Sequence, residues 1–346
     1  MRVLVATDAW RPQVNGVVRS LENLAEEAPA LGADLSFLTP DCFRTVALPT
    51  YREIRLAMAT PCAARRAIER FGPDYVHIAT EGPIGLATRR VCLADGRPFT
   101  TSYHTRFPEY LSARLPVPER WSYAWLRRFH NAGAGTMVST STLERELASR
   151  GFRHLMRWTR GVDAELFRPR AGSVIDAPRP ILLYVGRVAV EKNVAAFLAL
   201  DLPGTKVVVG DGPARASLEA AHPDARFLGV RSGAELAAIY ASADVFVFPS
   251  LTDTFGIVLL EALASGLPVA AFPVAGPLDV IGDSGCGVLD ADLGRAVRAA
   301  LAIPREGCRA YALSFTWRES ARQFLDNVRL AHAREDGHRS GPAATE

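Results

Sequence analysis

The stretch that decides the fold runs from Pro249 to Val269 and reads PSLTDTFGIVLLEALASGLPV. It follows an apolar run at residues 244–248 that has the length and composition of a buried strand. A polar turn comes next, then an apolar helix that ends at Gly266, and another strand begins at Pro268. A strand, a helix and a second strand within about 30 residues form a crossover between parallel strands. The stretch therefore predicts a parallel α/β sheet.

Two carboxylates, Asp253 and Glu261, lie eight residues apart in this stretch. Asp253 precedes the predicted helix, where backbone N–H groups and the positive end of the helix dipole attract anions. Glu261 lies further along a helix that is otherwise apolar, and a carboxylate there is costly to bury without a partner. The residues alone leave two interpretations open: Asp253 caps the helix and Glu261 faces water, or both acids serve a ligand.

The composition places the chain among soluble globular proteins. Its 346 residues are enough for two domains of ordinary size, and 49% apolar with 22% charged residues is typical of that class. The five cysteines are scattered without a C-x-x-C pair, which argues for a reducing compartment and against a disulfide framework or a zinc site. No secretory signal follows Met1, and the most apolar run, residues 262–276, is broken by Ser, Gly and Pro. We therefore expect a cytoplasmic protein.

Charge is distributed unequally between the two halves. Residues 1–162 carry 22 arginines and 15 acidic residues, whereas the remainder carries 18 basic and 22 acidic residues. A basic half attracts anionic lipid or an anionic substrate, and a peripheral location at the inner face of the membrane would follow. A general preference for arginine over lysine, which runs through the whole chain, explains the same numbers. Both interpretations stay open.

The first half alternates strand-like and helix-like runs, which predicts a doubly wound α/β sheet. The strand-like runs are residues 2–6, 35–38, 75–78, 99–103 and 136–139, and the helical patterns between them are residues 17–31, 61–71, 84–94, 119–131 and 142–150. Ligands bind at the carboxyl ends of strands in such sheets. Asn15 and Gly16, in the loop after the first strand, and His104, just past the strand at residues 99–103, are therefore candidates. A simple Asn-Gly turn and a structural histidine are the alternatives.

An arginine-rich aromatic stretch occupies residues 106–131. Trp121, Trp125 and Phe129 recur every four residues and so share one face of a helix. That face either lies on a membrane interface, with arginines reaching lipid headgroups, or packs inside the domain. The arginines are Arg114, Arg120, Arg127 and Arg128.

The second half restarts the alternating pattern after a linker rich in Pro, Gly, Ser and Ala at residues 169–180. We therefore expect domains at residues 1–165 and 175–316. A helix at residues 317–333 is long enough to cross back to the first domain, and the tail at residues 335–346 is expected to be disordered.

Two cations follow the first strand of the second half. Arg187 and Lys192 lie five residues apart around the start of a helix, an arrangement that suits a diphosphate. A surface ion pair with Glu191 is the alternative. Further on, Gly210-Asp211-Gly212 begins like a dinucleotide fingerprint, but Arg215 stands where the last glycine would be, so we do not expect a nicotinamide site.

In their order along the chain, these segments resemble the retaining glycosyltransferases of family 4. The stretch from residue 249 resembles the E-x7-E element of that family, with Asp253 in place of the usual first Glu. The resemblance covers nearly the whole chain and rests on Asn15-Gly16, His104, Gly186-Arg187, residues 191–193, residues 210–213 and residues 253–266. It implies the GT-B fold, in which two Rossmann-like domains face each other across a cleft. The first would bind the acceptor and the second the nucleotide sugar.

The resemblance also implies roles for individual residues. His104 and Asp253 would lie at the transferred sugar, Arg187 and Lys192 would hold the donor diphosphate in place of a metal, and Glu261 would hold the ribose. The base would lie along the strand that ends at Val230. The remaining donor-binding residues would be Asn15, Gly16, Gly186, Asp211, Gly212, Thr254, Phe255 and Gly256. Transfer with retention is implied, with no metal, no cofactor and no nucleic acid partner.

Within the family, the segments at residues 7–19 and 250–256 look like those of bacterial α-mannosyltransferases and glycolipid synthases. The resemblance therefore implies GDP-mannose or a UDP-sugar as the donor, and a lipid, such as diacylglycerol, or a glycan as the acceptor. A sugar-nucleotide epimerase and a non-catalytic nucleotide-sugar binder are remoter alternatives, since neither needs the whole set of His104, Arg187, Lys192 and Glu261.

Overall fold

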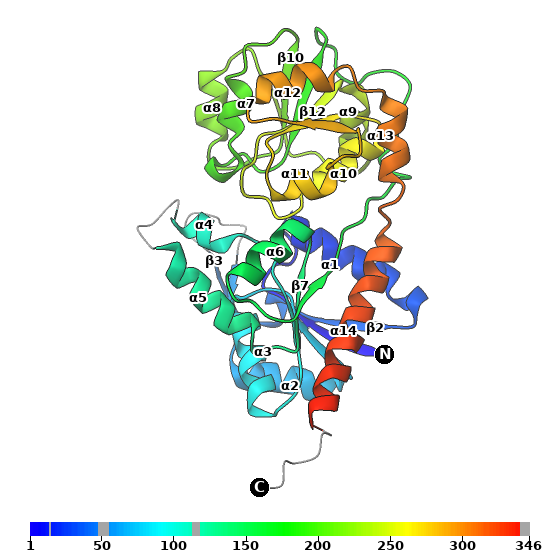
Figure 1. Ribbon diagram of the computed structural model, residues 1–346. Coiled ribbons are helices and arrows are strands. Elements are labelled where there is room, and N and C mark those ends of the chain that lie inside the picture. Colours follow the sequence, from blue (N-terminus) through cyan, green and yellow to red (C-terminus); the bar gives the residue numbers. More distant parts are fainter. Residues whose placement is uncertain (14, 48–54, 113–117, 340–346) are drawn as a thin grey trace. The chain divides into compact units, whose positions relative to one another are not determined.

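The computed structural model describes residues 1–13, 15–47, 55–112 and 118–339 (Figure 1). The chain divides into two compact units. Unit 1 comprises Met1–Thr159 together with Trp317–Glu346, and unit 2 comprises Arg160–Thr316. Each unit is built on a six-stranded sheet in which all strand pairs are parallel. The predicted fold class, two doubly wound parallel sheets, is confirmed.

The sheet of unit 1 has the strand order β2-β1-β5-β6-β7-β8. Because all these strands are parallel, their carboxyl ends share one edge of the sheet. The order reverses between β1 and β5, and this switch point is where open α/β sheets bind ligands. The strands are β1 (Arg2–Ala6), β2 (Asp34–Leu38), β5 (Tyr75–Ile78), β6 (Thr100–Ser102), β7 (Gly135–Val138) and β8 (Leu155–Arg157).

Helices cover both faces of this sheet. Val3 and Val5 belong to the core that includes the last helix of the chain, whereas Leu4 and Ala6 belong to the core on the opposite face, as the alternation of a strand requires. An antiparallel pair, β3 (Thr45–Ala47) and β4 (Arg55–Ala57), lies outside the sheet. The helices are α1 (Gly16–Glu27), α2 (Pro61–Phe71), α3 (Pro83–Ala94), α4 (Phe107–Ser112), α5 (Glu119–His130), α6 (Ser141–Ser149) and α14 (Trp317–Arg339), with short 3-10 turns at Pro29–Leu31 and Pro40–Cys42.

Helix α14 returns from unit 2 to pack on unit 1. Its Phe324, Leu325 and Val328 are buried with residues of β1 and α1, and the Trp158 indole N–H donates to the Ser320 carbonyl oxygen at 3.1 Å. The helix continues to Arg339, so the prediction of disorder from Glu335 is wrong for residues 335–339, which extend the helix by about one more turn. Residues 340–346 lie outside the described part of the chain.

Helix α5 places two of its aromatic residues on the surface. Trp121 is 63% exposed and Trp125 44% exposed, whereas Phe129 is buried. The packed face of this helix contains Tyr123 and Leu126, so the interpretation of an inward aromatic face is wrong for both tryptophans. Arg114 lies outside the described residues. No described helix has the length and apolar character that crossing a bilayer requires.

The sheet of unit 2 has the strand order β11-β10-β9-β12-β13-β14, with its switch point between β9 and β12. Ile181, Leu183 and Val185 of β9 face one core, and Leu182 and Tyr184 face the other. The strands are β9 (Ile181–Val185), β10 (Thr205–Val209), β11 (Arg226–Gly229), β12 (Val245–Phe248), β13 (Val269–Ala271) and β14 (Gly287–Leu289). The helices are α7 (Val194–Leu198), α8 (Arg215–Ala221), α9 (Gly233–Ser242), α10 (Ile257–Ala264), α11 (Ala275–Val280), α12 (Leu293–Ala300) and α13 (Arg305–Ala312), with a 3-10 turn at Val190–Lys192.

Candidate functional site

An ion pair marks the switch point of unit 2. The Lys192 Nζ lies 2.5 Å from the Asp253 Oδ1, and both side chains are about four-fifths buried, with 21% and 18% exposure. Lys192 belongs to the loop after β9 and Asp253 to the loop after β12. They are 61 residues apart in sequence, and they meet because β9 and β12 are neighbours in the sheet. Two residues that the sequence predicts for the donor site are thus brought together.

Two further hydrogen bonds connect the same loops. The Asn193 side-chain amide donates to the Pro249 carbonyl oxygen at 3.2 Å, and the Thr252 hydroxyl donates to the Glu191 carbonyl oxygen at 3.3 Å. The second carboxylate oxygen of Asp253, Oδ2, is buried and has no hydrogen-bond partner within the described residues. A buried carboxylate oxygen without a donor is uncommon in proteins and suggests a place for a ligand hydroxyl.

The loop that carries Arg187 is held by close backbone contact with the loop after β10. The Val188 N–H donates to the Asp211 carbonyl oxygen at 2.9 Å, and the Ala214 N–H donates to the Val188 carbonyl oxygen at 3.0 Å. A Cβ at Gly210 would lie 1.9 Å from the Gly186 carbonyl oxygen, and one at Gly212 would lie 2.4 Å from that of Val188. Both positions therefore require glycine. The Gly-Asp-Gly segment thus supports the Arg187 loop.

Glu261 is buried, with 2% exposure, and accepts a hydrogen bond from the Tyr240 hydroxyl at 3.0 Å. The interpretation that Glu261 sits on the wet side of its helix is therefore wrong. Tyr240 comes from α9, which packs beside α10 and supplies the polar partner that a buried carboxylate needs. The sequence contained no signal for this pair, because the tyrosine lies in a different apolar helix.

Helix α10 starts without a side-chain cap. Its N-cap is Gly256, which has a φ of +86° and no side chain, so the interpretation that Asp253 caps this helix is wrong. Thr254 and Phe255 precede the helix; Thr254 is half-buried, and Phe255 is buried in the unit 2 core. Val230, just after β11, is 56% exposed. Within the described residues the N-cap of α10 supplies no side-chain acceptor, so the first backbone N–H groups of this helix are candidates for binding an anion.

The switch point of unit 1 is organised around Asp8, which follows β1. Its carboxylate accepts hydrogen bonds from the Ile84 N–H at 2.8 Å, the Gly85 N–H at 3.3 Å and the Thr80 hydroxyl at 2.8 Å. Burial raises the pKa of this carboxyl, and the three hydrogen bonds oppose that shift only in part. Asp8, in the loop after β1, therefore caps α3, which follows a different strand, β5. The rule that selected His104, a polar residue directly after a strand, would also have selected Asp8.

The other predicted residues of unit 1 have local partners. The Asn15 side-chain oxygen accepts from the Val17 and Val18 N–H groups, both at 3.0 Å, so Asn15 caps α1, and Gly16 is the exposed first residue of that helix. His104 is half-buried just past β6, and its ring centroid lies 5.6 Å from that of Trp158. The Asn15-Gly16 segment, after β1, and His104, after β6, therefore both lie at the carboxyl edge of the sheet, as predicted.

A buried histidine network at the same edge was not predicted. His130, which is fully buried, lies 2.9 Å from the Thr101 hydroxyl through Nδ1 and 3.1 Å from the Glu81 carboxylate through Nε2. Glu81 follows β5 and is partly exposed. Among the described residues, no three His, Cys, Asp or Glu side chains gather closely enough to hold a metal ion.

Known proteins resemble both units. The family model described as Glycosyltransferase Family 4 matches residues 14–166, and the one described as Glycosyl transferases group 1 matches residues 179–303. A GDP-mannose-dependent alpha-mannosyltransferase of Mycobacterium tuberculosis (strain CDC 1551 / Oshkosh) is 35% identical over 316 residues, which cover 84% of this chain and 83% of the relative. A sulfoquinovosyl transferase of Arabidopsis thaliana is 32% identical over 262 residues, covering 69% and 50%.

A solved structure resembles the whole fold. The sucrose-phosphate synthase from Thermosynechococcus elongatus matches with a TM-score of 0.78 over 96% of this chain and 99% of that chain, at 20% identity. This likeness concerns the GT-B architecture, whereas the sequence relatives and the family models concern the kind of enzyme. The chain therefore belongs to glycosyltransferase family 4 and is a nucleotide-sugar-dependent glycosyltransferase with the GT-B fold.

Proposed function

We propose that the enzyme transfers a mannosyl group from GDP-mannose to a lipid or glycan acceptor, with retention of configuration and without a metal ion. The observation that carries the proposal is the pairing of Lys192 with Asp253 at the switch point of unit 2, beside Arg187 and the uncapped start of α10. The choice of mannose is supported by the mycobacterial relative, which is matched over 83% of its length.

The proposed chemistry follows from where charge develops. As the bond between sugar and diphosphate breaks, negative charge builds on the departing phosphate. Arg187, Lys192 and the backbone N–H groups at residues 254–256 would stabilise that charge, which is the task a metal ion performs elsewhere. Asp253 holds Lys192 in place through one oxygen, and its buried second oxygen would accept a hydrogen bond from a donor-sugar hydroxyl. Attack by the acceptor from the face of the leaving phosphate would retain the configuration.

The remaining roles complete the proposed donor site. Glu261, held by Tyr240, would accept hydrogen bonds from the ribose hydroxyls, and the base would lie against the exposed Val230. Gly186, Asp211 and Gly212 would act through the position of the Arg187 loop. In unit 1, His104, Asn15 and Gly16 would contribute to the sugar pocket from the carboxyl edge of the sheet.

The donor is tested by measuring thermal unfolding with GDP, UDP, GDP-mannose and UDP-glucose, before and after treatment with EDTA. We expect stabilisation by GDP and GDP-mannose that is unchanged by EDTA, because binding to the native state raises its stability by mass action. Stabilisation by UDP species alone would instead favour a UDP-sugar:diacylglycerol glycosyltransferase. Stabilisation that requires added Mg²⁺ or Mn²⁺ would contradict the metal-free chemistry.

We further propose that α5 rests on an anionic membrane surface. Trp121 and Trp125 are exposed on a helix whose last turn contains Arg127 and Arg128, a combination suited to the interface between headgroups and acyl chains. The double variant Trp121→Ser/Trp125→Ser should sediment less with vesicles that contain phosphatidylglycerol, while its turnover of a water-soluble acceptor stays unchanged. Equal sedimentation of wild type and variant would contradict this role.

A further inference from the structure

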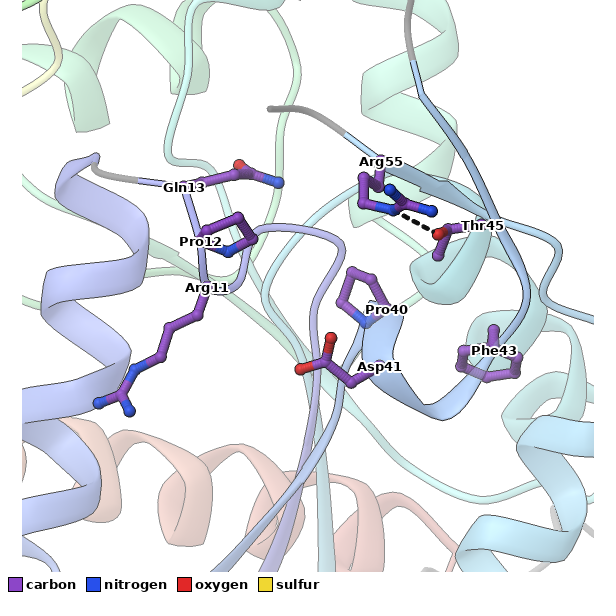
Figure 2. A pocket seen from close by; sticks show the side chains of 8 residues that line it. All are labelled: Arg11, Pro12, Gln13, Pro40, Asp41, Phe43, Thr45 and Arg55. Carbon is purple, nitrogen blue, oxygen red and sulfur yellow. Dashed lines mark hydrogen bonds between the residues drawn. The ribbon is translucent and has the colours of Figure 1, made fainter. Parts of the chain in front are cut away.

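The pocket beside β1 and β2 in unit 1, about 300 Å³ in volume, is lined by exposed charged side chains (Figure 2). Arg11, Asp41 and Arg55 all lie on the surface, where water satisfies their hydrogen-bonding groups. Such a pocket shows no preference for one class of ligand. The polar groups around α7 in unit 2 are different, because they are partly buried and bind specific backbone oxygens.

Lysine is rare in this chain. Of its 40 basic residues, 38 are arginines and two are lysines, Lys192 and Lys206. The compact ammonium group of lysine has three donors at a single point, which the planar fork of arginine does not offer. Both lysines adjoin the same short helix. Lys192 lies two residues before the start of α7 at Val194, and the Lys206 side chain contacts the other end of that helix. This distribution suggests that both positions require an ammonium group.

The Lys206 ammonium binds the carbonyl groups at the end of α7. Its Nζ donates to the Leu198 carbonyl oxygen at 2.6 Å and to that of Leu200 at 2.5 Å. The last carbonyls of a helix have no partner within the helix, and a lysine is a favourable donor there. Burial lowers the pKa of Lys206, and the charges of Asp201 and Asp224 oppose this shift. A guanidinium spreads its donors over a wider fork and does not converge on both oxygens from one point.

The pleat of β10 directs Lys206 toward α7. Val208 shares a core with the buried residues of α7, whereas Val207 and Val209 belong to the core on the other face of the sheet. Because side chains alternate along a strand, Lys206 lies on the same face as Val208. The ammonium therefore reaches the end of α7 from the strand that the helix covers.

The start of α7 is fixed by contacts with the loop after β12. Asn193 has a left-handed φ of +52°, which asparagine tolerates better than most residues, and its side-chain amide donates to the Pro249 carbonyl oxygen at 3.2 Å. The preceding residue, Lys192, pairs with Asp253. Apolar packing is non-directional, so the polar contacts at the two ends set the position of α7 along its axis. A shift at its end would move the backbone of Lys192.

We infer that Lys206 is a positioning residue of the donor site, which anchors the end of α7 and thereby places Lys192. The inference rests on the proposed role of Lys192 at the donor diphosphate and adds a residue that controls it from another strand. The Lys206 ammonium is engaged with backbone carbonyls, so it acts through Lys192 and not on the donor. Misplacing a group in a site by about 1 Å costs up to roughly 100-fold in rate, so a small movement of α7 is enough to matter.

Selective labelling with [15N]lysine makes the position of Lys192 observable, because the full chain then gives two labelled backbone amides. Lys192→Arg and Lys206→Arg assign the two signals. We expect the Lys192 amide to shift in Lys206→Arg, which keeps the charge, and in Lys206→Met, which keeps the stem. The dissociation constant for GDP, from calorimetric titration, should rise about tenfold in both. The control is Arg226→Lys, the reverse exchange at an exposed position of the neighbouring strand β11, which should change neither.

A second measurement tests whether Lys206 acts through Lys192. In the Lys192→Met background, Lys206→Met should not weaken GDP binding further, because two residues that share one effect are not additive. An unchanged Lys192 signal in Lys206→Arg, an unchanged affinity for GDP, or additive losses in the double variant would each overturn the inference.

Unfolding temperatures and nucleotide responses separate the remaining explanations. A merely structural Lys206 would lower the unfolding temperature of its variants without moving the Lys192 signal, and that result also contradicts the inference. Absence of any response to GDP and UDP in the wild type would contradict the proposed donor site. The Lys192 signal of the nucleotide-free proteins then decides independently whether Lys206 positions Lys192.

Discussion

The two units share a parallel sheet with a switch point, but they differ in how the helices at that edge begin. In unit 1, side chains cap the helices that follow β1, β5 and β7: Asn15 caps α1, Asp8 caps α3 and Thr140 caps α6. In unit 2, within the described residues, none of the N-cap residues of α7, α8, α9, α10 and α11 makes a side-chain capping bond. The contrast concerns the helices around the switch points, since Asp292 caps α12 of unit 2 and α5 of unit 1 has no side-chain cap. Unit 1 satisfies α1 and α3 with its own polar side chains, whereas the N-caps of α7 and α10 in unit 2 contribute no side-chain acceptor.

The contrast predicts different ligand preferences on similar sheets. A capped helix start has its N–H donors occupied, and at α3 the occupant is itself an anion, so a phosphate would gain little there. An uncapped start beside Arg187 and Lys192 offers both donors and positive charge. We therefore expect anionic ligands to bind unit 2 and uncharged, hydroxyl-rich ligands to bind unit 1.

The largest effect should come from the two cations. Arg187→Ala and Lys192→Ala should each lower the transfer rate about 100-fold, because each removes a group that stabilises charge on the leaving phosphate. Steady-state kinetics with a saturating acceptor measures the loss, and Arg295→Ala, an exposed arginine of the same unit that pairs with Asp290, is the control. Unchanged turnover in both variants would remove the leaving-group role.

An intermediate effect is expected when the Asp8 carboxylate, which caps α3 in unit 1, is removed. Asp8→Ala should destabilise the fold by about 1–3 kcal/mol, since the buried N–H groups of Ile84 and Gly85 and the Thr80 hydroxyl lose their acceptor. Inorganic phosphate or sulfate should then raise the unfolding temperature of the variant more than that of the wild type, because the uncapped α3 gains an anion site. Asp34→Ala is the control, and an identical anion response in all three proteins would show that the cap is not what keeps anions out.

The smallest effect should come from Glu261→Gln, which keeps the shape of the side chain and a hydrogen bond to Tyr240. Nucleotide affinity should fall about tenfold, because an amide is a weaker acceptor for ribose hydroxyls than a carboxylate. Tyr240→Phe should change stability more than affinity, since it leaves a buried carboxylate short of a donor. Calorimetric titration with GDP separates the two, and a larger affinity loss in Tyr240→Phe would place the tyrosine itself at the nucleotide.

Local sequence patterns predicted much of the fold and part of the site. Apolar runs ended by Gly or Pro predicted the strands, and the position after a strand selected Arg187, Lys192 and His104, because ligands gather at carboxyl ends. The contact between Lys192 and Asp253 could not be predicted from such local patterns. It depends on β9 and β12 being neighbours, and strand order follows from packing across the whole unit, which no window of residues records.

Periodicity also has a limit that α5 illustrates. The spacing of Trp121, Trp125 and Phe129 places them along one stripe, but it does not say whether that stripe faces the core. The helix packs through Tyr123, Leu126 and Phe129, so the stripe straddles the boundary between core and surface. The capping of α1 by Asn15 could have been predicted from the sequence, since Asn before a helix is a favoured cap.

The return of α14 to unit 1 has a consequence for synthesis. Unit 2 is one continuous segment, residues 160–316, inserted between β8 and the helix that buries Val3 and Val5. A ribosome therefore completes unit 2 before it has made the last piece of unit 1, and domains generally fold as units during translation. Unit 1 must therefore wait, with one face of its sheet uncovered, until unit 2 and then α14 have been made. Residues 160–316 are accordingly suited to separate expression, whereas residues 1–159 without α14 are not.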